Sequence, residues 1–240
     1  MNQLEQIEQW HGFKYPELYH RLYNDGMLDW GEFGPNWHAT YWEKFKINPP
    51  LLLLGNDIEL LDLNRRDNGT SIIENIGDFE SPDCYLQIKP EFKFIPFAKT
   101  GGGDFYVFQF DKQNGDDVPV TLVPHDYMLA EVLAKNLQDF IFRMLLECVV
   151  DIDEHTRIAD GDLKTNLFNM LKTHKPYLSQ NQAAKVEEIY SRDLFKHILK
   201  YPNGNEESLT GLISMDEIDD TLRQEIGFEG LDEEFQYTSD

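Results

Sequence analysis

The chain has 240 residues, with 21 Lys and Arg against 44 Asp and Glu, so its formal net charge is −23. Its hydrophobic content of 41% and aromatic content of 13% exceed those of a disordered acidic chain, so we expect a folded core with the surplus acid on its surface. Such a surface repels nucleic-acid phosphates and anionic membranes, and it attracts basic proteins. We therefore expect neither nucleic acid nor membrane as a partner.

Two cysteines, Cys84 and Cys148, lie far apart and form no C-x-x-C pair, which argues against a disulfide framework or a thiolate metal site. The first residues lack the basic and apolar regions of a signal peptide. The longest purely apolar runs, residues 51–54 among them, are too short to span a membrane. These features predict a cytoplasmic protein.

In the N-terminal part, apolar residues at helical spacing predict a helix over residues 4–11 and a second helix that opens at Pro16. Residues 27–50 are aromatic and turn-rich, and we predict an ordered loop packed over the core. Two interpretations stay open for Trp37 and Tyr41 in this stretch. Their rings are either packed under the loop or exposed as anchors for a partner.

From residue 51 the apolar period shifts toward two, which predicts six strands, at residues 51–54, 58–63, 71–76, 92–97, 105–110 and 118–123. Turns rich in Gly, Asn and Asp separate several of them, at Gly55-Asn56-Asp57, Asp67-Asn68-Gly69 and Gln113-Asn114-Gly115. Residues 105–110 are almost all apolar, as expected of a central strand covered on both faces. Residues 127–149 carry an apolar stripe that predicts one long helix across the sheet.

The rest of the chain differs in charge, which suggests three parts: an α+β domain over residues 1–150, a helical extension packed on it over 151–205, and an acidic C-terminal segment over 206–240. The extension carries 8 basic and 8 acidic residues, whereas the last part carries one Arg against 12 acids. Capping boxes at Ser179 and Ser214 predict helices, the first of them reaching Ile198. We expect the end of the chain, from Asp232, to fray.

Two stretches resemble ligand loops and fail on their details. Gly101-Gly102-Gly103 lies between two predicted strands and is followed by Asp104, so it predicts a tight connection with positive φ rather than a phosphate loop. Residues 151–162 begin like a calcium loop, but the required Gly and final Glu are replaced by Thr156 and Asp162. We expect neither a metal nor a cofactor.

The histidines do not form a recognisable catalytic pattern. None of the seven is spaced as in a helical zinc motif, and no nucleophile elbow accompanies His125-Asp126, which predict a turn before the long helix. The chain is therefore expected not to be an enzyme. A hydrolase that uses two of the 44 carboxylates stays open as an alternative, because no pair is singled out.

The order of elements carries a family resemblance. The segments that carry it are a Pro-x-Leu-Tyr helix start (Pro16, Leu18, Tyr19), then Phe94-Ile95-Pro96-Phe97-Ala98, then Gly102-Gly103-Asp104 entering an aromatic strand, and a closing helix with Leu137, Phe140 and Ile141. This order resembles the SUKH superfamily, which includes toxin-immunity proteins and fungal regulators of glucan synthesis. The resemblance covers roughly residues 5–150.

The resemblance implies an α+β fold, with a mixed or antiparallel sheet of about five to six strands flanked by helices and a C-terminal helical extension beyond it. It also implies binding rather than catalysis: an immunity protein that neutralises a basic, nuclease-type toxin domain by occluding its active cleft. The alternative is a non-catalytic regulator of cell-wall glucan synthesis. We expect a monomer or weak dimer, and the candidate partner-binding residues are Trp37, Tyr41, Asp104, Asp116 and Asp117.

Overall fold

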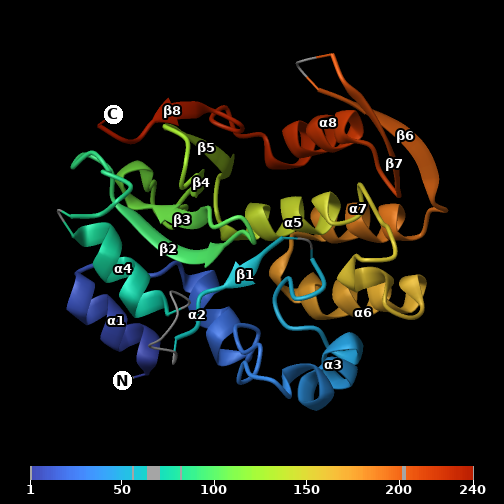
Figure 1. Ribbon diagram of the computed structural model, residues 1–240, viewed down its shortest axis with the longest axis horizontal. Coiled ribbons are helices and arrows are strands. Elements are labelled where there is room, and N and C mark those ends of the chain that lie inside the picture. Colours follow the sequence, from blue (N-terminus) through green and yellow to red (C-terminus); the bar gives the residue numbers. More distant parts are fainter. Residues whose placement is uncertain (1, 56, 64–70, 82, 202–203, 240) are drawn as a thin grey trace. The chain divides into compact units, whose positions relative to one another are not determined.

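The computed structural model describes residues 2–239 except 56, 64–70, 82 and 202–203 (Figure 1). The chain divides into two compact units. The first unit comprises Met1–Asp29, Asp57–Phe140 and Phe228–Asp240, and the second comprises Trp30–Asn56 and Ile141–Gly227. The division does not follow chain order. Residues 30–56 belong with the C-terminal half, and the last residues return to the first unit.

The first unit contains a six-stranded sheet in the order β1-β2-β3-β4-β5-β8, in which every neighbouring pair is antiparallel. Its strands are β1 (Glu59–Leu60), β2 (Phe94–Lys99), β3 (Phe105–Gln109), β4 (Val120–Val123), β5 (Leu129–Ala134) and β8 (Glu234–Gln236). The unit also holds α1 (Gln3–His11), α2 (Glu17–Asn24), α4 (Ile72–Glu80) and the 3-10 turn η1 (Phe110–Lys112). The predicted α+β fold with an antiparallel sheet is confirmed.

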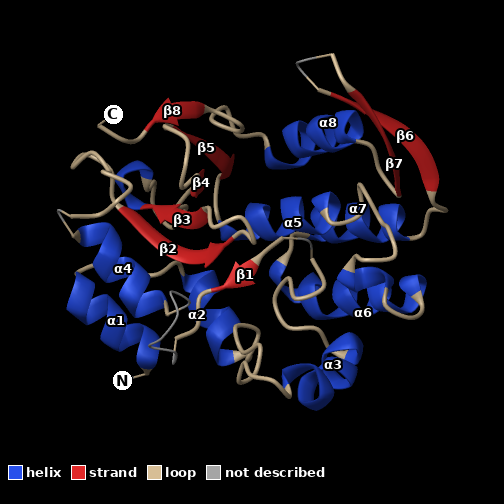
Figure 2. Cartoon of the chain, viewed as in Figure 1, coloured by secondary structure: helices blue, strands red, loops and turns tan. Residues whose placement is uncertain are grey.

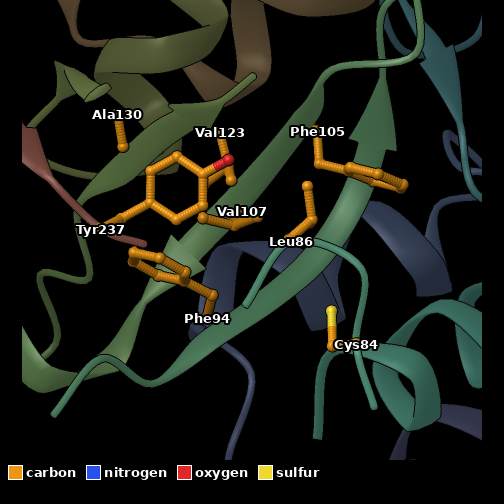
Figure 3. Packing of buried hydrophobic residues seen from close by; sticks show 8 residues of the cluster. All are labelled: Cys84, Leu86, Phe94, Phe105, Val107, Val123, Ala130 and Tyr237. Atoms are coloured by element: carbon orange, nitrogen blue, oxygen red, sulfur yellow. The ribbon is translucent and has the colours of Figure 1, made fainter. Parts of the chain in front are cut away.

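Strand β3 is central and buried on both faces, as its apolar sequence predicted. On one face Phe105 and Val107 join a cluster with Phe94 and Tyr237, which Figure 3 shows in close contact. On the other face the ring of Phe108 lies 5.4 Å from that of Tyr19 in α2. Because alternate side chains of a strand point to opposite faces, one apolar strand supplies both cores.

The second unit contains the rest of the helices and a separate β-hairpin. Its elements are α3 (Trp37–Ile47), most of α5 (Leu137–Glu147), η2 (Arg157–Ala159), α6 (Leu163–His174), η3 (Lys175–Tyr177), α7 (Gln180–Tyr190), β6 (Phe195–Lys200), β7 (Glu206–Gly211) and α8 (Met215–Ile226) (Figure 2). The capping box at Ser179 opens α7 as predicted. None of the described helices is long and apolar enough to cross a membrane.

Two predicted strands are wrong. Residues 51–54 form a buried turn in which Leu52 has φ 55°, and Trp30 Nε1 donates to the carbonyl of Leu51 at 3.0 Å. Side chains thus satisfy the backbone of a turn that is apolar enough to resemble a strand. Residues 71–76 start helix α4, which Ser71 caps by accepting from the Glu74 N–H.

The predicted helix over 127–149 is half wrong. Its first part is β5, and α5 begins after Asn136, whose Oδ1 accepts from the Asp139 N–H at 3.0 Å. The helix predicted from Ser179 to Ile198 likewise ends at Tyr190 and is followed by β6. In both cases the apolar residues of the segment fit the helical period of 3.6 as well as the strand period of 2. A local helix cap or chain break then determines which structure forms.

The structure also differs from the predictions in the aromatic stretch and near the end of the chain. Residues 37–47 of the expected loop form α3, and the expected frayed end contains β8, which pairs with β5. The predicted turn Asp67-Asn68-Gly69 and Asn56 of the Gly55-Asn56-Asp57 turn lie outside the described residues. The Gln113-Asn114-Gly115 turn does connect β3 to β4, after the 3-10 turn η1.

Candidate partner-binding surfaces

The glycine-rich connection between β2 and β3 positions Asp104. Gly103 has φ 101°, and the Thr100 N–H donates to the Asp104 carbonyl at 2.7 Å, so the predicted tight turn with positive φ is confirmed. The Asp104 N–H in turn donates to Thr100 Oγ1 at 3.0 Å. The turn therefore holds the Asp104 side chain in a fixed, half-exposed position at one end of the sheet.

Asp104 binds His125 in the loop between β4 and β5. Its Oδ1 accepts from the His125 backbone N–H at 3.0 Å and from Nδ1 at 2.7 Å, which makes Nδ1 the protonated ring nitrogen. This hydrogen bond raises the pKa of His125, and the charge of Asp126 adds to the rise. The expected turn at His125-Asp126 is present, but it leads into β5 and not into a helix.

Asp104, His125 and Asp126 each place one ligand-type atom within 4.8 Å of the others, a spacing that a divalent cation could bridge. Such exposed groups are also common on acidic surfaces without a metal. The expectation that the chain binds no metal stays a prediction. Within the part of the chain that the structure describes, no Lys or Arg lies within ion-pair distance of Asp104 or Asp126, so this end of the sheet is locally acidic.

Exposed aromatic rings adjoin these carboxylates. Tyr85 is 64% exposed and Tyr127 is 56% exposed. Partial burial raises the pKa of Tyr85, and the charges of Cys84, Asp78 and Asp104 add to the rise, so Asp104 acts on this side chain electrostatically. We call Tyr85, Asp104, His125, Asp126 and Tyr127 the Asp104 surface. Tyrosine rings beside carboxylates are suited to bind Lys and Arg side chains of a partner.

Asp116 and Asp117 lie at the opposite end of the β3–β4 pair. Asp116 is exposed. Asp117 pairs with Lys135 at 2.8 Å and accepts from Asn136 Nδ2 at 2.6 Å. Burial opposes ionisation, yet these two hydrogen bonds hold the pKa of Asp117 below its ordinary value. Asp117 thus orients Asn136, the residue that caps α5.

Trp37 and Tyr41 lie in α3, in the second unit, and both are half-buried. Trp37 Nε1 donates to the Trp30 carbonyl at 2.7 Å, and its ring stacks on Phe33 at 5.5 Å between centroids. Tyr41 stacks on Phe45 at 5.5 Å. The rings form a packed cluster and are only partly exposed, and the interpretation of Trp37 and Tyr41 as anchors for a partner stays a prediction.

The five predicted residues are divided between the two units, and in the first unit Asp104 and Asp117 are kept apart by the length of a strand. Tyr85 and Tyr127 were missed. The signal that could have found them is a tyrosine within two residues of an Asp in a loop, at Asp83 and Asp126. Such loop tyrosines are frequent contact residues.

Comparisons with known proteins identify the family. The family model described as SMI1 / KNR4 family (SUKH-1) matches residues 2–143, which is more than half of the chain. No curated protein and no solved structure matches it. The matched residues include all the segments on which the resemblance was based, from Pro16 to Ile141. The chain belongs to the SMI1 / KNR4 family (SUKH-1).

Proposed function

We propose that this chain is an immunity protein that binds a basic toxin domain and neutralises it by occluding the active cleft. The observation that carries the proposal is membership of the SUKH-1 family, which supports an immunity or regulatory role. The net charge of −23 favours the immunity branch, because a nuclease cleft is basic and an acidic inhibitor gains long-range attraction to it.

The Asp104 surface is the docking site that we propose for the toxin. Its carboxylates attract Lys and Arg, and its exposed Tyr85 and Tyr127 supply the apolar area from which binding energy is gained at an interface. Asp104 is held by the β2–β3 turn and by His125, so little side-chain entropy is lost when a partner binds. Trp37, Tyr41, Asp116 and Asp117 remain proposed contacts of lower priority.

Co-expression with toxin domains encoded beside the gene tests the function. We expect one of them to become non-toxic and to form a complex that dissociates as salt is raised. Protection from none of them, with no complex at low salt, would reject the immunity role.

The contact surface is tested separately by the variants Asp104→Asn with Asp126→Asn, and Tyr85→Ala with Tyr127→Ala. We expect weaker toxin binding with an unchanged far-UV circular dichroism spectrum. The matched control is Glu154→Gln, which neutralises a carboxylate that is 87% exposed in the second unit. If these variants bind as tightly as the unmodified chain, the toxin docks elsewhere and the immunity role is unaffected.

The second candidate is a non-catalytic regulator of cell-wall glucan synthesis, and the same family match favours it. It predicts association with the machinery of wall synthesis and no protection from any toxin. Loss of glucan content on deletion of the gene, in cells that carry no cognate toxin, would select this role.

A further inference from the structure

The β6–β7 hairpin exposes more apolar surface than its length accounts for. Ten large hydrophobic side chains are exposed in the described part of the chain, and four of them fall within residues 194–201: Leu194, Phe195, Ile198 and Tyr201. Figure 2 shows the two strands side by side, and they form a two-stranded sheet of their own. A two-stranded hairpin is marginally stable in water, so a third strand would stabilise it.

The hydrogen-bond pattern shows which edge of the hairpin is open. The Tyr201 N–H donates to the Asn205 carbonyl at 2.9 Å, in the same register that pairs His197 with Leu209. The backbone N–H and C=O groups of successive residues in a strand point to opposite edges. Those of Phe195, His197 and Leu199 therefore also point toward β7. The N–H and C=O groups of the residues between them, Lys196, Ile198 and Lys200, therefore point away from β7.

The other edge of the hairpin is already covered. The Thr210 carbonyl accepts from the Ile152 N–H at 2.6 Å, and the Thr210 N–H donates to Asp151 Oδ1 at 3.2 Å. A side chain on Gly211 would collide with the Val150 carbonyl, so this approach is close. In the described part of the chain, the unpaired edge is that of β6.

Charge distinguishes the β6 edge from the rest of this acidic molecule. Lys196, Ile198 and Lys200 share one face, all three are exposed, and Ile198 is 53% exposed. Lys200 lies 3.7 Å from Glu206, and Lys196 stands opposite the uncharged Thr210. The edge thus presents backbone donors and acceptors, with an apolar side chain between two cations.

We propose that the β6 edge binds an extended segment of a partner protein in which acidic residues flank an apolar one, added as a third strand. Backbone hydrogen bonds would supply affinity, and pairing of acidic residues with Lys196 and Lys200 would supply selectivity. A second copy of this chain is a poor occupant, because antiparallel pairing centred on Ile198 places Lys196 opposite Lys200 of that copy. A basic toxin is repelled for the same reason, so this site is independent of the Asp104 surface.

Lysines on an edge strand can also serve only to prevent unwanted pairing. That role accounts for Lys196 and Lys200, but not for Ile198, which is exposed between them. A bound segment with acidic residues on either side of an apolar one would contact both the lysines and Ile198. The two roles differ in whether an acidic strand binds.

The test uses a cyclised β-hairpin peptide whose outer strand reads Glu-Thr-Val-Thr-Glu, titrated into the ¹⁵N-labelled full chain. We expect chemical-shift changes at the backbone amides of Lys196, Ile198 and Lys200, and binding about tenfold tighter than that of the same peptide with Lys for Glu. No shift at millimolar peptide, or equal binding of both peptides, would overturn the proposal.

Charge reversal gives the matched variants. Lys196→Glu should weaken binding of the peptide with Glu and strengthen binding of the peptide with Lys. It introduces no repulsion across the hairpin, because the uncharged Thr210 stands opposite. Lys172→Glu, at an exposed lysine of α6, should change neither. A concentration-dependent dimer in sedimentation that Ile198→Asp abolishes would assign the edge to a second copy and reject the acidic segment.

Discussion

His174 is a fully buried histidine that fixes the turn at Leu52. Its Nε2 accepts from the Leu52 N–H at 2.9 Å, and its Nδ1 donates to the Met170 carbonyl at 2.8 Å, so the ring is neutral. Burial lowers the pKa from 6.5 to about 4, against the opposing hydrogen bond to Met170. A protonated ring would lose its acceptor, and the Leu52 N–H would be left buried without a partner.

The low pKa of His174 makes stability depend on pH. As pH falls below 6.5, His174 becomes protonated in the unfolded chain, whereas in the folded chain it stays neutral until about pH 4. The free energy of unfolding should therefore fall by about 3 kcal/mol across that window and be unaffected by His174 above it. Urea unfolding at pH 7 and pH 4 measures the loss.

His174→Phe should be less stable than the unmodified chain at pH 7, because the Leu52 N–H loses its acceptor, and it should lack this part of the pH dependence. The control variant is His155→Gln, at a histidine whose side chain is 83% exposed. An unaltered pH profile in His174→Phe would contradict the assignment.

His125 should show the opposite shift. The hydrogen bond to Asp104 raises its pKa, so its imidazole proton signals should titrate above pH 6.5 in nuclear magnetic resonance spectra. Asp104→Asn keeps an acceptor but removes the charge, and it should lower that pKa. As pH falls through the raised pKa, His125 gains a positive charge that cancels one negative charge of the Asp104 surface. If Asp104→Asn leaves the titration unchanged, the pair described here does not form in solution.

At the scale of elements, β8 is a short strand that completes the first unit. It pairs with β5, and Tyr237 directly after it is 2% exposed and donates its hydroxyl proton to the Pro124 carbonyl at 2.5 Å. Burial raises the pKa of this hydroxyl to about 12. Figure 3 shows the Tyr237 ring among Ala130, Val123, Val107 and Phe94, so this residue near the end of the chain is part of the core.

Tyr237→Ala should lower the free energy of unfolding by about 3 kcal/mol, because it leaves a cavity and an unpaired carbonyl. Gln236→Ala changes an exposed residue of β8 and should have almost no effect. Chemical denaturation of both variants makes the comparison. Equal stabilities would mean that the C-terminal residues do not pack in solution as they do here.

The elements predicted correctly are those with a single consistent signal. Helix α1 ends at Gly12 with φ 67°, and α7 starts at a complete capping box. The wrong elements are apolar segments that fit both periods, such as residues 129–134. In that segment the cap contact between Asn136 and Asp139 determines where the helix begins. In the sequence such a contact is visible only as two polar residues three positions apart.

The candidate site was less predictable than the fold. The turn before Asp104 followed from its glycines, but the pairing with His125 joins residues 21 positions apart. That contact depends on the register between β3 and β4, which places Phe105 opposite Val123. Exposure of Tyr85 likewise depends on tertiary packing, which composition and spacing do not encode.

For the whole molecule, the charge of −23 is spread over segments of unequal structural importance. Residues 206–240 carry 12 acids and one Arg, but they also include β7, α8 and β8. Deleting them would remove Tyr237 from the core together with the charge. Single substitutions at exposed acids separate the two effects.

Two variants with the same net charge should therefore distinguish steering from contact. Glu229→Gln with Glu234→Gln removes two exposed charges near the C-terminus, and Asp104→Asn with Asp126→Asn removes two from the Asp104 surface. If the toxin is attracted by the overall charge, both double variants should associate about two- to threefold more slowly at low salt than the unmodified chain. Added salt should erase this difference in association rate.

If the Asp104 surface is the contact, the Asp104→Asn, Asp126→Asn variant should also dissociate faster, and that effect should persist at high salt because contacting charges are screened least. Stopped-flow association and dissociation rates at two salt concentrations measure both terms, and equal dissociation rates in the two variants would move the contact away from Asp104.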